Sequence, residues 1–284
     1  MDINQRFIVI EGLSGSGKTT QAKRLTARLN AEHAPAILNT EPTKENPMPF
    51  GKLIRQIIEG TPLDRQMAGI CIGTIHNLYA QLIACIDTSW ETRTKRARAG
   101  KLFSDIENKL YRMAERADGV NLLDELELQI LYLIDRMFDL VHTVIPKTEQ
   151  GYVVVQDRFE LSTFAYGGSR GLSIEDLWSL QAMIAGEYYR VPAVTVIFKV
   201  SPEVAAERLR KSGKPIDRFE ESVLSLTNID REYSRLANFV RGKHLQIATK
   251  NRENWFGILS IDANRPEDEV FEELWRLASG IFLK

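Results

Sequence analysis

Five short apolar runs are spaced along the chain, and helical patterns separate them. The first run, at 7–10, is apolar at every position, which is typical of a strand that is buried on both faces. Similar runs lie at 36–40, 152–157, 194–200 and 258–262. At 18–29 the apolar positions share one face, which is typical of an amphipathic helix. The alternation of strand patterns with helical patterns predicts an α/β fold with an open, parallel, five-stranded sheet flanked by helices.

The stretch from residue 61 to residue 150 lacks strand patterns and has helical spacing instead. Its apolar positions form three groups, which predict helices at about 75–86, 102–113 and 126–144. A basic segment at 92–101 lies between the first two groups. We expect this segment to be a link with a solvated, charged face.

Composition places the chain among ordinary globular proteins. Of its 284 residues, 44% are hydrophobic and 26% are charged, which excludes a disordered chain, a collagen and a disulfide scaffold. The formal net charge of -1 gives no overall attraction to nucleic acid or to a membrane. Cys71 and Cys85 lack metal-ligand spacing and are expected to be reduced core thiols. With no apolar stretch that spans a membrane and no signal-peptide pattern, the expected location is the cytoplasm.

Residues 12–19 carry the pattern G-x-x-x-x-G-K-[ST], after the first predicted strand and at the start of the first predicted helix. Its glycines let backbone N–H groups turn towards phosphate oxygens, and the helix N-terminus adds positive charge. Lys18 is expected to reach the terminal phosphates from an exposed loop, and the Thr19 hydroxyl is expected to bind Mg²⁺. The pattern predicts a nucleoside triphosphate site, an ATP site if the chain is a kinase, formed by Gly12, Leu13, Ser14, Gly15, Ser16, Gly17, Lys18, Thr19 and Thr20. GTPase switches, motor ATPases and small-molecule kinases share this loop, so the other motifs must decide how the nucleotide is used.

Asp157 and Arg158 end the third predicted strand. In a parallel sheet this end lies at the same edge as the phosphate loop. An Asp there is suited to hold Mg²⁺ through water, and an Arg there is suited to grip a second phosphate with two hydrogen bonds. A surface salt bridge is the alternative, but idle charge is costly directly after apolar strand residues.

A basic segment at about 207–220 follows the fourth predicted strand and has a glycine and a proline near its centre. Phosphoryl transfer leaves negative charge on the moving group, and arginines stabilise this charge when a lid closes over ATP. Because the phosphate loop has no arginine, this role is predicted for Arg208, Arg210 and Arg218. The alternative interpretation of the same residues is a solvated helix face.

Together these motifs resemble the thymidylate kinase family, its bacterial members especially. The segments that match the family pattern are 7–21, 41–60, 131–168, 196–220 and 261–270. The resemblance implies a P-loop kinase fold in one domain over residues 1–284. Within it, about 61–124 would be a helical insertion and about 207–220 a lid.

The resemblance also implies roles for individual residues. Arg158 would bind the acceptor phosphate, and Arg136 would hydrogen-bond the pyrimidine base on which Tyr132 stacks. Ser162 and Thr163 would approach the edge of the base. The substrate-binding residues would be Glu41, Tyr132, Arg136, Arg158, Ser162, Thr163 and Tyr166, with Tyr166 favouring deoxyribose. The catalytic residues would be Lys18, Arg158, Arg208, Arg210 and Arg218, and the metal ligands Thr19 and Asp157.

The chain departs from the family pattern at three places near the acceptor. Ser14 stands where the family usually has a carboxylate, Thr40 where an arginine is common, and Gly167 where Ala-Tyr-Gln-Gly has its glutamine. The resemblance implies phosphorylation of dTMP to dTDP by ATP and Mg²⁺, in a homodimer. Two alternatives stay open: a kinase for another deoxypyrimidine monophosphate or small acceptor, and a nucleotide-binding regulatory module without turnover.

Overall fold

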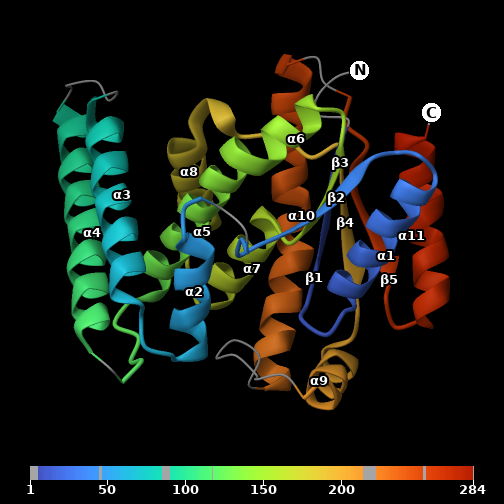
Figure 1. Cartoon of the computed structure of the whole chain (residues 1–284), viewed down its shortest axis with the longest axis horizontal. Coiled ribbons are helices and arrows are strands. Elements are labelled where there is room, and N and C mark those ends of the chain that lie inside the picture. The colour runs from blue at the N-terminus through green and yellow to red at the C-terminus, as the bar shows by residue number, and fades with distance from the viewer. Residues whose placement is uncertain are drawn as a thin grey trace.

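The computed structural model of the chain describes residues 6–44, 47–84, 90–116, 118–213, 222–251 and 254–283, with side chains for all of these except 82–84 and 90–98. At its centre is a parallel sheet with the strand order β2-β3-β1-β4-β5 (Figure 1). The strands are β1 (Phe7–Gly12), β2 (Ala36–Thr40), β3 (Val153–Asp157), β4 (Val194–Lys199) and β5 (Gly257–Asp262). The predicted α/β class and its five strands are confirmed.

Helices surround this sheet. The α-helices are α1 (Lys18–Ala31), α2 (Phe50–Glu59), α3 (Arg65–Ala84), α4 (Trp90–Glu115), α5 (Glu125–Asp139), α6 (Ile145–Glu149), α7 (Glu160–Ser169), α8 (Ile174–Ala185), α9 (Pro202–Lys211), α10 (Val223–Asn251) and α11 (Glu267–Phe282). A π-helical turn, η2 (Leu140–Val144), follows α5, so the helix predicted at 126–144 is α5 plus this turn. A short 3-10 turn, η3 (Gly186–Tyr188), follows α8. Among the described residues, no helix is both long enough and apolar enough to cross a membrane.

Successive side chains of β1 point to opposite faces of the sheet and belong to two apolar clusters. Ile8 and Ile10 of β1 belong to the main core together with Leu25 of α1. Phe7 and Val9 belong to a smaller cluster with residues of η2. In Figure 1, α1 and α11 lie on one side of the sheet, and α5, α7 and α10 lie on the other.

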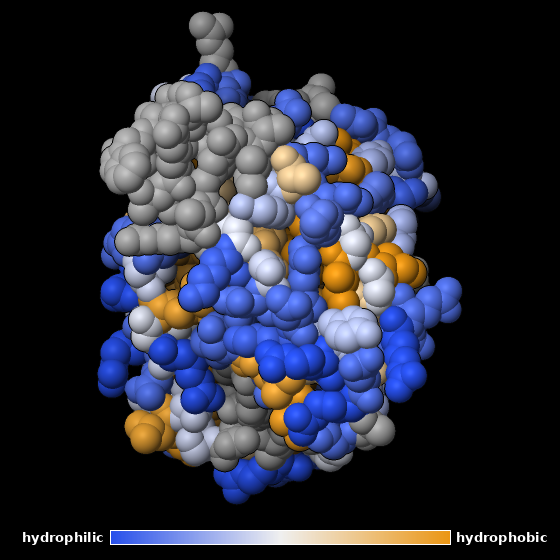
Figure 2. Space-filling view, turned by 90° about the vertical axis from the view of Figure 1, so that its left-hand side faces the viewer, coloured by the Kyte–Doolittle hydropathy of each residue, from blue (hydrophilic) through white to orange (hydrophobic). Residues whose placement is uncertain are grey.

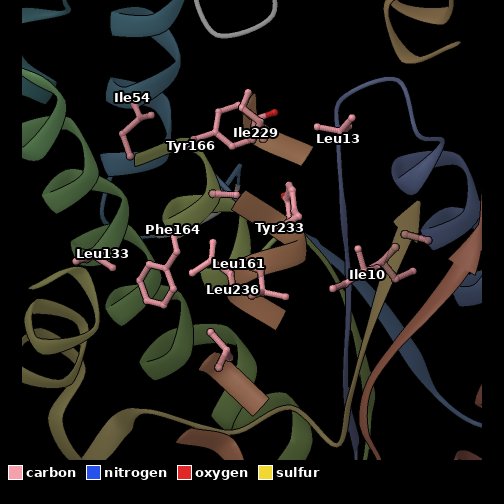
Figure 3. Packing of buried hydrophobic residues seen from close by; sticks show 14 of the residues in the cluster. Ile10, Leu13, Ile54, Leu133, Leu161, Phe164, Tyr166, Ile229, Tyr233 and Leu236 are labelled. Carbon is pink, nitrogen blue, oxygen red and sulfur yellow. The ribbon is translucent and has the colours of Figure 1, made fainter. Parts of the chain in front are cut away.

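Helix α10 packs between the sheet and α7. Figure 3 shows Tyr233 of α10 between Ile10 of β1 and Leu161 of α7, and all three side chains belong to the same core. Helix α7 begins at Glu160, two residues after Arg158, and β1 leads into the phosphate loop. This packing therefore holds the two segments of the predicted site against each other.

Helices α3 and α4 lie side by side at the end of the molecule furthest from α11 (Figure 1). The expected link at 92–101 was wrong, because α4 runs without a break from Trp90 to Glu115. Arginine, lysine and alanine are strong helix formers, and a charged face does not end a helix. Gly100 permits close packing of the pair, since a Cβ there would lie 2.2 Å from the Tyr79 hydroxyl.

The α3–α4 pair is anchored to α5. Lys109 of α4 forms a 2.7 Å ion pair with Glu127, which is buried in the first turn of α5 and completes a capping box with Asp124. Cys71 of α3 is buried in the core, and burial raises the pKa of its thiol to about 12, whereas Cys85 lies outside the described residues. Figure 2 views the molecule from this end, where the described surface is mainly hydrophilic with small, separate hydrophobic areas.

Candidate active site

The predicted phosphate loop connects β1 to α1, and its glycines adopt backbone conformations that other residues rarely reach. The φ angles of Gly12, Gly15 and Gly17 are +136°, +80° and +90°. A Cβ on Gly12 or Gly15 would lie 2.5 Å from the backbone oxygen of Phe198 or Ala205. Glycine is therefore required at Gly12 and Gly15, both by the φ angle and by the close approach of β4 and α9.

A cavity of about 500 Å³, here called the loop cavity, opens at this loop. Residues 14–21 line it, so Ser14 to Thr20 of the predicted ATP site face the cavity, whereas Gly12 and Leu13 do not line it. Lys18 is only 4% exposed, and its Nζ donates to the Leu13 backbone oxygen at 2.6 Å. The expectation of an exposed Lys18 was wrong, because the side chain folds back over the loop.

The two predicted metal ligands, Thr19 and Asp157, are in contact. The β1–β3 register pairs Ile10 with Asp157, which brings the carboxylate to the edge of the loop, and Thr19 Oγ1 donates to Asp157 Oδ2. Asp157 Oδ1 is buried and accepts no hydrogen bond from the described residues. An unpaired carboxylate oxygen beside a hydroxyl fits Mg²⁺, which binds through one or two carboxylates together with water and phosphate oxygens.

Arg158 lies between the loop cavity and a second cavity and lines both. Its φ angle is +74°, which is uncommon for a residue other than glycine, and its backbone N–H donates to the Ile10 oxygen at 3.0 Å. The guanidinium donates to Ser14 Oγ at 2.6 Å and to Ser162 Oγ at 3.2 Å. Ser14 Oγ also lies 3.2 Å from the Tyr166 hydroxyl, so it links the two sides of the site.

The second cavity, here called the side pocket, has a volume of about 100 Å³. The predicted substrate-binding residues on its surface are Glu41, Tyr132, Arg158, Ser162, Thr163 and Tyr166. The sequence reasoning missed Pro42, Ile58 and Gln129, which also line it. Gln129 lies three residues before Tyr132 on α5, so helical spacing from Tyr132 was the signal that points to it.

Arg136, the remaining predicted substrate-binding residue, does not line the side pocket. Its side chain is 1% exposed and forms a salt bridge to Glu41, with Nη2 2.6 Å from Oε2. It also donates to Thr163 Oγ1 and to Gln181 Oε1, both at 2.8 Å. Burial raises the pKa of Glu41 to about 8, although the Arg136 guanidinium opposes the rise. Arg136 therefore holds two pocket residues in place from behind.

Glu11 is a buried acid to which the sequence reasoning gave no role. Its Oε1 accepts from the backbone N–H groups of Phe159 and Ser162, and its Oε2 accepts from Ser162 Oγ at 2.6 Å and from the Tyr233 hydroxyl at 3.1 Å. Burial raises the pKa of Glu11, which the Ser162 hydrogen bond and the Arg158 charge oppose. The signal was a charged residue inside an otherwise apolar strand.

The structure describes two of the three predicted lid arginines, and it places them on different faces of α9. Arg208 lines the loop cavity and donates to the Ala263 backbone oxygen at 2.9 Å. Arg210 is exposed outside this cavity and donates to Ala206 within its own helix. Arg218 lies outside the described residues. Arg265, which the sequence reasoning did not single out, also lines the loop cavity.

Known proteins are similar in sequence to this chain over most of its length. The family model for thymidylate kinase matches residues 10–95 and 97–256. A thymidylate kinase of Deinococcus radiodurans is 27% identical over 275 residues, 96% of each chain, and one of Pelotomaculum thermopropionicum is 25% identical over 283 residues, 98% of this chain and 96% of the relative. One of Geobacillus thermodenitrificans is 33% identical over 146 residues, which span 51% of this chain and 58% of that relative. The resemblance and the P-loop kinase fold expected from the sequence are confirmed, and the chain belongs to the thymidylate kinase family.

Proposed function

We propose that this chain transfers the γ-phosphoryl group of ATP to the phosphate of dTMP, which yields ADP and dTDP. The observation that carries the proposal is the place of Arg158, which lines both the loop cavity and the side pocket. An arginine at this junction is suited to hold the acceptor phosphate beside the phosphoryl donor. The related proteins are named for this activity, thymidylate kinase.

In this reaction an oxygen of the dTMP phosphate attacks the γ-phosphorus of ATP. The bond between that phosphorus and the β–γ bridging oxygen breaks, and ADP leaves. Because the transferred group carries spread negative charge, catalysis consists of positioning and charge stabilisation. Lys18 and Arg208, which line the loop cavity, supply positive charge, and Arg158 orients the acceptor phosphate. Thr19 and Asp157 would hold Mg²⁺, which when bound neutralises charge on the phosphate oxygens.

The side pocket takes the base and the sugar of the acceptor. Tyr132 offers an aromatic face for stacking, and Thr163 offers a polar group to the edge of the base. Tyr166 lies near the junction with the loop cavity, because its ring centre is 5.4 Å from the Arg158 guanidinium carbon and its hydroxyl contacts Ser14. A sugar that connects the base to the phosphate would pass this tyrosine, which supports its role in selecting deoxyribose.

A coupled assay of ADP release against a panel of nucleoside monophosphates tests the proposal. We expect dTMP to give the highest kcat/KM, above dUMP, dCMP and the ribonucleotide of thymine. A higher value for another acceptor would identify that acceptor as the substrate. ATP binding without ADP release for any member of the panel would support the regulatory module instead. Chelation of Mg²⁺ in the same assay should stop turnover.

We also propose that the chain acts as a homodimer in the cytoplasm and as one kinase domain over residues 1–284. Support for a single domain comes from the core, where Ile75 of α3 and Phe103 of α4 join the cluster that contains Ile8 of the sheet. Light scattering during gel filtration tests the homodimer, and cell fractionation tests the location. A single cooperative unfolding transition is expected for one domain.

A further inference from the structure

Gln129 lines the side pocket and has a buried oxygen without a hydrogen-bond partner among the described residues. The residue lies on α5, lines the pocket and is 1% exposed. Its Oε1 accepts no hydrogen bond from the residues that the structure describes. Because buried polar atoms in native proteins are nearly always hydrogen-bonded, a buried acceptor without a partner on a residue that lines a pocket indicates a donor on the ligand.

The neighbouring Glu125 fixes the orientation of the Gln129 amide. Nε2 of Gln129 donates to Oε1 of Glu125 at 2.5 Å, and an ionised carboxylate only accepts hydrogen bonds. Turning the amide around would place its oxygen against the carboxylate and would lose this bond. The amide group is therefore held with its oxygen free to act as an acceptor.

Helix α7 leaves room for the Gln129 side chain. A Cβ on Gly167 would lie 3.3 Å from Gln129 Cγ, which is tighter than ordinary van der Waals contact. Gly167 is also the position at which the family pattern has a glutamine. This chain thus lacks a glutamine on α7 and packs one from α5 against the same place.

From these contacts we propose that Gln129 selects the base of the acceptor by accepting a hydrogen bond from its ring N3–H group. Thymine and uracil carry this N–H between two carbonyl groups, whereas N3 of cytosine is an acceptor. Two acceptors that face each other repel and stay unpaired, so a cytosine base is disfavoured. The inference rests on the proposed function and narrows its substrate class to deoxynucleotides of thymine and uracil.

Binding of dTMP and of dCMP to the wild type and to Gln129→Leu, measured by isothermal titration calorimetry, tests this role. The leucine side chain is similar in size but has no acceptor. We expect the affinity for dTMP to fall by about tenfold or more, while that for dCMP does not fall, so the preference for dTMP decreases. A preference that stays within about twofold of the wild type would overturn the proposal.

Glu125→Gln tests the anchor and provides a second variant if Gln129→Leu does not fold. After this change the side chain at position 125 both donates and accepts, so the Gln129 amide is free to turn. The preference for dTMP over dCMP should fall about threefold or more. An unchanged preference in this variant overturns the proposal. The matched control is Glu175→Gln, the same change in the first turn of α8 outside the pocket, which should leave the preference as it is.

The assay of ADP release distinguishes failure of this inference from failure of the proposed function. If the wild type turns over dTMP and both variants keep its preference over dCMP, only the role of Gln129 is wrong. If the wild type binds dTMP without releasing ADP, the proposed function is wrong, and the binding measurements still decide the role of Gln129.

Discussion

The loop cavity and the side pocket meet at Arg158, yet the chain builds them in different ways. Half of the residues that line the loop cavity, about 500 Å³, belong to one continuous segment, residues 14–21, in which Gly15 and Gly17 have positive φ angles. The side pocket, about 100 Å³, is enclosed by side chains from α2, α5, α7 and the segment after β2. Phosphate is bound by backbone groups that any chain with this motif has, whereas recognition of a base depends on which side chains meet in space.

The basic side chains of the two sites also have different partners. Lys18 in the loop cavity donates to a backbone oxygen, whereas Arg136 behind the side pocket forms a buried salt bridge with Glu41. A lysine that lines the loop cavity is suited to contact a phosphate there, whereas removal of one partner from a buried ion pair leaves an uncompensated charge. We therefore expect changes in the loop cavity to affect turnover, and changes beside the side pocket to affect acceptor binding and stability.

The largest effect is expected for Lys18→Ala. It should lower kcat by about 10³-fold, because no other group replaces a cation placed beside the terminal phosphates. Lys18→Met is the matched control, since it keeps an apolar stem in this buried place and removes only the charge. Steady-state kinetics and thermal unfolding check both variants. Wild-type turnover in either would contradict the assignment of the loop as the ATP site.

Arg208→Ala should lower kcat by about 10²-fold with a much smaller change in the KM for dTMP. The reason is that an arginine contact to the transferred phosphoryl group stabilises mainly the closed transition state. Arg210→Ala is the matched control on the same helix, and it should stay within about twofold of the wild type, because its side chain lies outside the loop cavity. Arg218→Ala completes the series. The lid mechanism is wrong if all three variants keep near wild-type kcat.

Arg136→Ala should raise the KM for dTMP far more than the KM for ATP. The loss in acceptor binding is expected to be about 1.5–3 kcal/mol, because Glu41 and Thr163 of the side pocket lose the charged hydrogen bonds that hold them in place. The variant should also lose about 3–5 kcal/mol of stability, because Glu41 stays buried without its partner. Combining Arg136→Met with Glu41→Gln separates the two effects, since it should restore stability without restoring binding. Equal changes in both KM values would place α5 outside the acceptor site.

The smallest effect concerns Asp139, a buried acid at the end of α5. Both of its carboxylate oxygens accept from Asn39 Nδ2, at 2.9 and 2.7 Å, and burial raises its pKa to about 7. The folded state therefore holds the proton more tightly than the unfolded state does. This contribution to stability is complete below the unfolded pKa of 3.8 and is lost as the pH rises to the folded pKa of about 7.

We expect the Tm of the wild type to fall between pH 5 and pH 7.5, and Asp139→Asn to reduce that fall by about 2–4 °C. Thermal unfolding of both proteins in matched buffers measures the difference. Parallel pH dependence in the two proteins would show that Asp139 does not take up this proton.

The parts of the fold and site that were predictable depend on short stretches of sequence. The run at 7–10 in β1 is apolar at every position, and the phosphate loop begins at residue 12, so spacing alone located both. The link expected at 92–101 failed because charge indicates solvent exposure and does not decide between helix and loop. The expectation that Lys18 is exposed was wrong because its Nζ donates to the Leu13 backbone oxygen, a contact that the motif does not specify. The face of α9 on which Arg210 lies depends on what packs against that helix.

The sequence by itself determined the order of strands and helices, the phosphate loop and the family, because these depend on periodicity and on motifs a few residues long. Only the tertiary structure decided which distant side chains share the side pocket. Arg136 meets Glu41 across 95 positions, and Gln129 of α5 packs against Gly167 of α7. Such contacts follow from how the helices pack together, so no local pattern contains them.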